Sequence, residues 1–155
     1  MMSTINLLFL EDNPDDAELA VFELEMAGLA LDWTCVDTQS DFKDSLHPDL
    51  DLIIADFNLP DFDALSAFQI LQDQRLDIPF IILSGTIGEE KAVEAIKLGV
   101  TDYVIKDRIA RLPSAVNQAI EQKKLERENK TMLLALQKSE QRVKAIINAL
   151  PDLVF

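Results

Sequence analysis

The fold of this 155-residue chain is decided by the segment D-L-I-I-A-D-F-N-L-P at residues 51–60. The apolar run at residues 50–55, which overlaps this segment, is interrupted only by Asp51, and the acid Asp56 follows it directly. A run of this kind is typical of a strand that is buried on both faces of a parallel sheet. Four further runs are similar in length and composition: residues 5–10, 31–36, 78–83 and 100–105.

Amphipathic stretches with the period of a helix separate these five runs. The first has the clearest ends, because Asn13 is a preferred N-cap residue, Pro14 suits the first helical position, and Gly28 suits the end. Parallel strands need right-handed crossover connections. Five strands that alternate with five helices therefore predict a doubly wound α/β sheet.

The pattern changes from about residue 122. No Gly or Pro interrupts residues 114–150, and a seven-residue spacing predicts a coiled-coil helix over 122–150. A solvated helix that packs only on its own domain is the alternative. Pro151 would end the helix, and the chain stops in an apolar stretch at Phe155, which favours a piece of a longer protein. The two seam positions hold Gln122, Asn129, Leu136, Val143 and Leu150, and Leu125, Met132, Ser139 and Ile146.

Acidic charge is concentrated ahead of this helix. The chain has a formal net charge of −14; residues 1–112 hold 23 acids and 7 bases, a net of −16, and residues 113–155 hold 5 acids and 7 bases, a net of +2. So acidic a region is a poor partner for nucleic acid or an anionic membrane surface. The longest uncharged stretch has 11 residues, against the ~20 that span a bilayer. No secretory signal is visible, and we expect a soluble cytoplasmic protein.

One cysteine and one histidine restrict the chemistry further. Cys35 alone excludes an intramolecular disulfide, and only His47 could join it in a zinc site, so zinc is not predicted. We expect Cys35 to be a small hydrophobic residue in a strand. No Walker sequence or G-x-G-x-x-G is present, which argues against a nucleotide site of those types.

The polar side chains that matter here follow the first, third, fourth and fifth predicted strands. In a doubly wound sheet, ligands bind at the carboxyl ends of the strands. Carboxylates crowded there stay ionised when a cation joins them, and a hard divalent ion such as Mg²⁺ fits their oxygen atoms. One carboxylate could then attack phosphorus while an ammonium stabilises the transferred group. The residues are Glu11 and Asp12, Asp56, Ser84, and Lys106.

These residues stand in segments that resemble a two-component response-regulator receiver domain. The resemblance covers about residues 3–125 and implies a flavodoxin-like sheet with strand order 2-1-3-4-5 and an extended C-terminal helix. It divides the chain into a receiver domain (1–121), a coiled-coil signalling helix (122–150) and the truncated start of a PAS-like domain (151–155). The matching segments are F-L-E-D-N at 9–13, D-L-I-I-A-D-F-N-L-P at 51–60, I-I-L-S-G-T at 81–86 and D-Y-V-I-K-D at 102–107.

The resemblance implies a role for each matching residue. Asp56 would accept a phosphoryl group that the ammonium of Lys106 binds. Ser84 would be the switch hydroxyl, in a position where Thr is more frequent, and Tyr103 the switch aromatic. Asp107 stands where receivers commonly have Pro, and its effect on the loop is left open. The implied Mg²⁺ ligands are Asp12, Asp56, Glu11 through water, and the backbone carbonyl of Asn58.

The implied donor is a phosphohistidine on a histidine kinase or a phosphotransfer protein. Phosphorylation would draw Ser84 and then Tyr103 inward, and so alter the face formed by the fourth helix, fifth strand and fifth helix, and the attached coiled coil. Residues 136–155 resemble the helical entry into a PAS domain. This favours a homodimer through the C-terminal helix and a full-length sensor histidine kinase or cyclic-dinucleotide enzyme.

Two other functions remain open at this point. Asp61 and Asp63 suggest a Mg²⁺-dependent phosphatase with an aspartyl nucleophile, although the Thr that such enzymes carry two residues further on is missing. A receiver-like interaction or dimerisation module that is not phosphorylated is the other possibility, and the complete acidic set argues against it.

Overall fold

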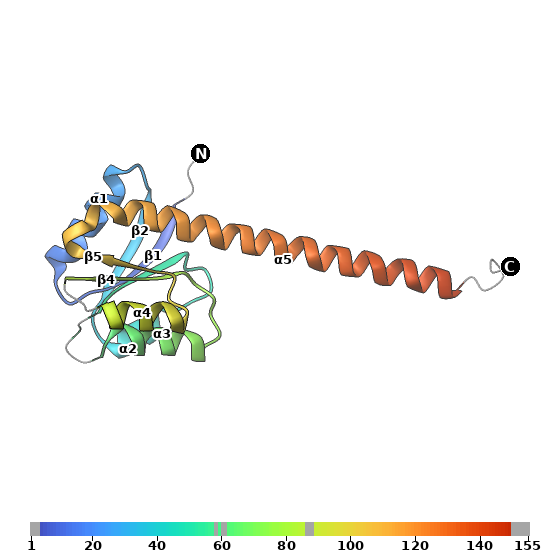
Figure 1. The fold of residues 1–155 in the computed structure, drawn as a ribbon, viewed down its shortest axis with the longest axis horizontal. Coiled ribbons are helices and arrows are strands. Elements are labelled where there is room, and N and C mark those ends of the chain that lie inside the picture. The colour runs from blue at the N-terminus through green and yellow to red at the C-terminus, as the bar shows by residue number, and fades with distance from the viewer. Residues whose placement is uncertain (1–3, 58, 60–61, 86–88, 150–155) are drawn as a thin grey trace. The chain divides into compact units, whose positions relative to one another are not determined.

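The structure, a computed structural model, describes residues 4–57, 59, 62–85 and 89–149. It divides into two units, Met1–Ile120 and Glu121–Phe155. In the first unit strands alternate with helices (Figure 1). The elements are β1 (Ile5–Leu10), α1 (Pro14–Met26), β2 (Leu31–Val36), α2 (Gln39–Ser45), β3 (Leu52–Asp56), α3 (Ala64–Asp73), β4 (Phe80–Ser84), α4 (Glu89–Leu98), β5 (Asp102–Ile105), the 3₁₀ helix η1 (Lys106–Arg111) and α5 (Leu112–Ala149).

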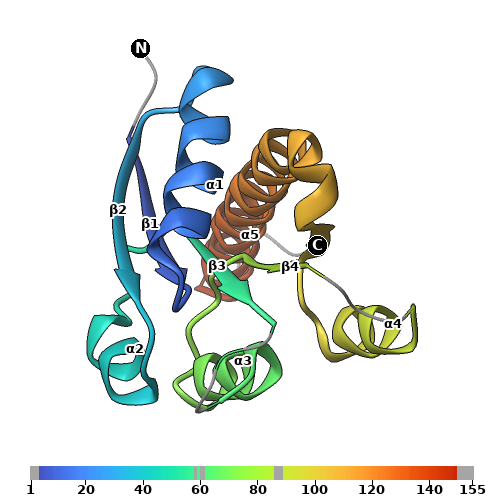
Figure 2. The same cartoon turned by 90° about the vertical axis from the view of Figure 1, so that its left-hand side faces the viewer.

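The five strands form one parallel sheet in the order β2-β1-β3-β4-β5. This confirms the doubly wound α/β fold and the flavodoxin-like strand order. Figure 2 shows α1 and the beginning of α5 on one face of the sheet and α2, α3 and α4 on the other. A hydrophobic cluster fills the space between the sheet and the helices on each face.

Each predicted apolar run overlaps a strand, but three of the runs begin earlier than the strands they predict. The runs at 50–55, 78–83 and 100–105 begin two residues before β3, β4 and β5. The first residue of each run is buried in the segment that leads into the strand, and apolar character alone does not separate such a residue from the strand itself. These residues are Leu50, Ile78 and Val100.

The start of α1 agrees with the prediction. Asn13 Oδ1 accepts a hydrogen bond from the Asp15 amide at 3.0 Å, and Pro14 takes the first helical position. Gly28, just past the end of the helix, has a φ of 94°, a conformation that favours glycine. The cap fixes the first turn of α1 directly after Glu11 and Asp12.

The second unit is helical throughout its described part, which belongs to α5. The predicted C-terminal helix is therefore confirmed up to residue 149, and it continues from Leu112 without a break at residue 122. No helix in the described part of the chain is long and apolar enough to cross a membrane. Leu150 and residues 151–155 lie outside the described residues.

Candidate metal and phosphoryl site

Strand register brings four polar side chains to one edge of the sheet. Each paired position lies at or beside the end of a strand. The side chains of Glu11, Asp56, Ser84 and Lys106 therefore lie next to one another at the carboxyl edge of the sheet. The prediction that these residues gather at the carboxyl ends of the strands is confirmed. The pairs are Leu10 with Ala55 between β1 and β3, Asp56 with Leu83 between β3 and β4, and Ser84 with Ile105 between β4 and β5.

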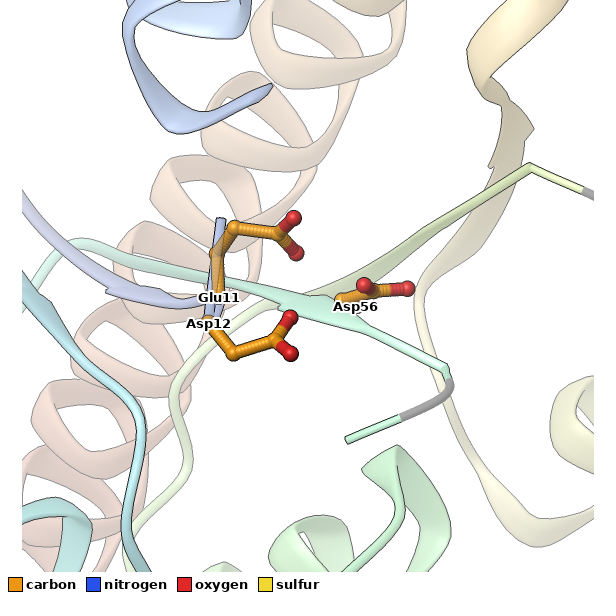
Figure 3. Close-up of side chains that lie close together, drawn as sticks. All are labelled: Glu11, Asp12 and Asp56. Carbon is orange, nitrogen blue, oxygen red and sulfur yellow. The ribbon is translucent and has the colours of Figure 1, made fainter. Parts of the chain in front are cut away.

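Three carboxylates converge at this edge. Glu11, Asp12 and Asp56 each contribute an oxygen atom, and these atoms lie within 4.8 Å of one another. Figure 3 shows the side chains of Glu11 and Asp12 extending toward Asp56 from the end of β1. Glu11 and Asp56 are buried, with 3% and 8% of their surface exposed, whereas Asp12 is exposed.

The three carboxylates fit a hard divalent cation such as Mg²⁺, which prefers oxygen ligands. Glu11 Oε2 is buried and has no hydrogen-bond partner in the part of the chain that the structure describes. A buried polar atom of this kind is costly unless an ion or its water contacts it. Asn58, the fourth ligand that the resemblance implies, lies outside the described residues.

The buried position of the Glu11 carboxyl strongly raises its pKa. Burial, followed by the interactions with Asp56, raises the pKa of Glu11 from 4.5 to about 8, against the opposing effect of Lys106. A cation bound between Glu11 and Asp56 would stabilise both carboxylates in the ionised form. Proton and cation therefore compete for Glu11.

Lys106 contacts three carboxylates, one of which the sequence analysis did not include. Its Nζ lies 3.2 Å from Glu11 Oε1 and 3.4 Å from Asp56 Oδ2. The shortest contact, 2.7 Å, is with Asp16 Oδ2 in the first turn of α1. Burial would lower the pKa of Lys106, but the hydrogen bond to Asp16 and the charges of Glu11 and Asp56 outweigh burial and raise it.

Two buried hydroxyls lie beside the carboxylates. Ser84 is fully buried, and neither Ser84 Oγ nor Tyr103 Oη has a hydrogen-bond partner among the described residues. Burial raises the pKa of the Tyr103 hydroxyl against the opposing effect of the neighbouring Ser84 hydroxyl, and the charge of Asp56 adds to the rise. The ring packs against the hydrophobic cluster under α2, α3 and α4. The Tyr103 hydroxyl is thus already turned inward in this structure.

The backbone of Tyr103 is fixed at both of its polar groups. Asp102 Oδ1 accepts a hydrogen bond from the Tyr103 amide at 2.7 Å, and the Arg111 guanidinium donates to the Tyr103 carbonyl. The same guanidinium pairs with both carboxylate oxygens of Asp102, at 3.1 and 3.3 Å. Asp107 lies in η1, between Tyr103 and Arg111 in the sequence. The chain from Lys106 onward therefore continues as a 3₁₀ helix at the position where receivers commonly have Pro.

The segment after Asp56 is positioned by α3 and α4. The Phe57 carbonyl accepts a hydrogen bond from the Ala64 amide at 3.4 Å, and Lys91 Nζ lies 5.2 Å from the centre of the Phe57 ring. Asp63 Oδ1 accepts from the Ser66 amide at 2.8 Å and caps α3. Asp63 therefore has a structural role, while Asp61, its partner in the phosphatase hypothesis, lies outside the described residues.

Cys35 lies in β2, as predicted for a strand residue, but it is exposed because β2 is an edge strand. Its thiol donates a weak hydrogen bond to the Glu11 carbonyl at 3.4 Å. A cavity of about 260 Å³ beside it is also lined by Glu11, Asp12 and Trp33. The only tryptophan of the chain therefore lines the same cavity as two of the carboxylates.

Asp16 is the main residue of this site that sequence reasoning missed. Asp15 and Asp16 both have a sufficient explanation as acids in the first turn of a helix. The available signal was the four-residue spacing from Asp12, which places Asp16 one helical turn beyond the end of β1.

Fold and site together define a flavodoxin-like α/β domain with a candidate divalent-metal site beside a lysine and a buried hydroxyl. A sequence model of the response regulator receiver domain matches residues 7–117. The chain belongs to this family.

Known proteins with the same domain are similar at low identity. The response regulator SaeR of Staphylococcus epidermidis is 28% identical over 101 residues, which cover 65% of this chain and 43% of the relative. The chain thus spans less than half the length of the curated relatives that it matches first. The receiver domain of the Francisella response regulator 1452 is 26% identical, with a TM-score of 0.66, and the match covers 77% of this chain and 98% of that one. A receiver domain protein from Clostridium thermocellum is 24% identical, also with a TM-score of 0.66, over 78% and 98%.

Proposed function

We propose that this chain is the phosphoacceptor of a two-component phosphorelay, in which Asp56 receives a phosphoryl group from a phosphohistidine. The donor would be a histidine kinase or a phosphotransfer protein. The observation that carries the proposal is the convergence of Glu11, Asp12 and Asp56 beside Lys106, in a chain that belongs to the receiver family.

The proposed chemistry assigns a separate task to each group. An Asp56 carboxylate oxygen attacks phosphorus, and the bond from phosphorus to the histidine nitrogen of the donor breaks. Glu11, Asp12 and Asp56 would hold Mg²⁺, which supplies positive charge toward the phosphoryl oxygens. Lys106 Nζ, 3.4 Å from Asp56 Oδ2, would donate to a phosphoryl oxygen. Ser84 Oγ would donate to another.

The first expected result is the uptake of one phosphoryl group. Incubation with acetyl phosphate and Mg²⁺ is expected to raise the intact mass by one phosphoryl group, and Asp56→Asn or excess EDTA is expected to abolish the change. Asp73→Asn, an exposed acid at the end of α3, is the matched control and should still be phosphorylated. Phosphorylation that survives Asp56→Asn, or none in the wild type with acetyl phosphate or a phosphohistidine donor, would contradict the proposal.

The proposed conformational change would pass from Tyr103 to the C-terminal helix. We place the receiver at residues 1–121, a coiled-coil signalling helix at 122–150 and the start of a PAS-like domain at 151–155. A hydrogen bond from Ser84 to the phosphoryl group would move Ser84 and change the space in front of Tyr103. Arg111, which holds the Tyr103 carbonyl, directly precedes α5 and offers a route to that helix.

We also propose that residues 122–150 pair with a second copy of the chain. The described apolar seam residues are at least half exposed, which is costly for side chains of this size without a partner. Asn129 would be a polar seam residue of the kind that fixes register in dimeric coiled coils. The exposed fractions are 50% for Leu125, 70% for Met132, 57% for Leu136 and 52% for Val143.

Seam and non-seam residues give a second prediction. The wild-type chain is expected to be a dimer at micromolar concentration by light scattering, and Leu136→Asp is expected to make it monomeric, because a charge in the seam has no partner. Leu134→Asp is the matched control, since Leu134 is 49% exposed but lies outside the seam. A monomeric wild type, or equal effects of the two substitutions, would refute the coiled coil.

A further inference from the structure

Asp16 is the closest partner of Lys106, although it follows none of the strands. The three hydrogens of the lysine ammonium meet three carboxylates, at 2.7 Å for Asp16, 3.2 Å for Glu11 and 3.4 Å for Asp56. The ammonium therefore has no hydrogen left over in this arrangement. The contact with Asp56 is the longest of the three.

The Asp16 carboxylate is suited to hold a charge at the rim of the site. Its side chain is 38% exposed, against 1% for Glu11 and 10% for Asp56, so water solvates it better than the two buried acids. The hydrogen bond from Lys106 also lowers the pKa of Asp16. The N-cap at Asn13 fixes the helical turn that carries Asp16.

We propose that Asp16 is a positioning residue that draws the Lys106 ammonium toward the rim and so limits its pairing with Asp56 and Glu11. This inference rests on the proposed function. Both buried acids are needed as ligands of the cation, and a lysine paired tightly with them would compete with that cation. Asp16 thus keeps Lys106 near enough to meet a phosphoryl oxygen and far enough to leave room for Mg²⁺.

Loss of the Asp16 charge has a defined consequence. In Asp16→Asn the ammonium keeps only the two buried carboxylates, and it is expected to close on Asp56 Oδ2 to the roughly 2.8 Å of a strong charged hydrogen bond. The cation would then have to displace it. We expect the dissociation constant for Mg²⁺ to rise about tenfold, as for other residues that position metal ligands.

The experiment compares neighbouring acids of equal charge. Mg²⁺ is titrated calorimetrically, without a phosphoryl donor, into the wild type, Asp16→Asn, Asp16→Glu and Asp15→Asn. Asp15 lies in the same helical turn and is exposed, and its side chain forms no ion pair with Lys106 among the described residues, so it controls for charge alone. Weaker binding in Asp16→Asn, with binding restored in Asp16→Glu and nearly unchanged in Asp15→Asn, supports the proposal. Equal effects of the two Asn variants, or none, overturn it.

Lys106→Met tests whether Asp16 acts through the lysine. If it does, Asp16→Asn should weaken Mg²⁺ binding in the wild-type background and have little effect in Lys106→Met. The same loss in both backgrounds would mean a direct effect of the Asp16 charge and would overturn the proposal.

Phosphorylation and crystallography separate this inference from the proposed function. The loss of phosphorylation rate in Asp16→Asn is expected to be smaller at saturating than at limiting Mg²⁺, because saturating Mg²⁺ outcompetes the lysine for the buried carboxylates. A wild type that binds Mg²⁺ but is never phosphorylated contradicts the proposed function alone. A crystal structure of Mg²⁺-free Asp16→Asn tests the inference without any measurement of metal binding. A Lys106 ammonium at its wild-type distance from Asp56 would overturn the inference.

Discussion

Lys106→Met is expected to slow the phosphorylation of Asp56 by acetyl phosphate roughly 10²–10³-fold, the usual cost of removing one donor that stabilises charge in a transition state. Lys106 Nζ is the one described cation within hydrogen-bond reach of Asp56, Glu11 and Asp16 together. Met keeps a long unbranched side chain in the half-buried position and removes only the charge and the donors. The initial rate at saturating Mg²⁺ is the quantity to measure.

The substitution separates metal binding from phosphoryl transfer. Removing a positive charge beside three carboxylates is expected to leave the affinity for Mg²⁺ unchanged or higher, while the rate falls. Lys97→Met, in the last turn of α4, is the matched control because Lys97 is exposed. A Lys106→Met variant that is phosphorylated at the wild-type rate would remove Lys106 from the mechanism.

The strand ends were the most predictable part of this site, for a physical reason. Buried parallel strands are marked by continuous apolar runs. A polar residue directly after such a run therefore lies at the carboxyl edge of the sheet. Glu11, Asp12, Asp56, Ser84 and Lys106 could be located in this way. The order of the strands came from the resemblance, because an apolar run does not identify its neighbour.

Contacts between elements that are distant in the sequence could not be predicted in this way. Asp16 and Lys106 are 90 residues apart, and their contact depends on how α1 packs beside η1, which begins at Lys106. Arg111 was also missed, because a basic residue ahead of a helix has no visible partner in the sequence. The inward orientation of Tyr103 is a rotamer choice set by the surrounding cluster, and no motif encodes it.

The three carboxylate partners of Lys106 make the site a balance of charges. Asp16 holds Lys106 from the rim, and Asp56 and Glu11 hold it from within. Mg²⁺ would bind Asp56 and Glu11 in place of Lys106, and the phosphoryl group would then become the partner of Lys106. Substitutions at Asp16 and Lys106 are therefore expected to change the affinity for Mg²⁺ in opposite directions, which a loss of folding would not do.

Without Mg²⁺, the free energy of unfolding is expected to fall as the pH rises from about 4.5 to about 8, and Glu11 is the cause. Burial, followed by the interactions with Asp56, raises the pKa of Glu11 to about 8. The folded chain therefore binds one more proton than the unfolded chain across this interval. This contribution to stability is fully present below the unfolded pKa and is lost as the pH passes through the folded one. The slope approaches about 1.4 kcal/mol per pH unit at most.

Glu11→Gln isolates this effect from the titration of the other acids. The amide has nearly the same shape as the protonated carboxyl and does not ionise, so urea unfolding of the Mg²⁺-free variant should show a shallower loss of stability over the same interval. Mg²⁺ binds the ionised carboxylate, so its stabilising effect on the wild type should grow as the pH approaches 8. The variant should show a smaller effect of Mg²⁺ with less dependence on pH. If wild type and Glu11→Gln lose stability in parallel without Mg²⁺, the buried Glu11 carboxyl is not the group that titrates.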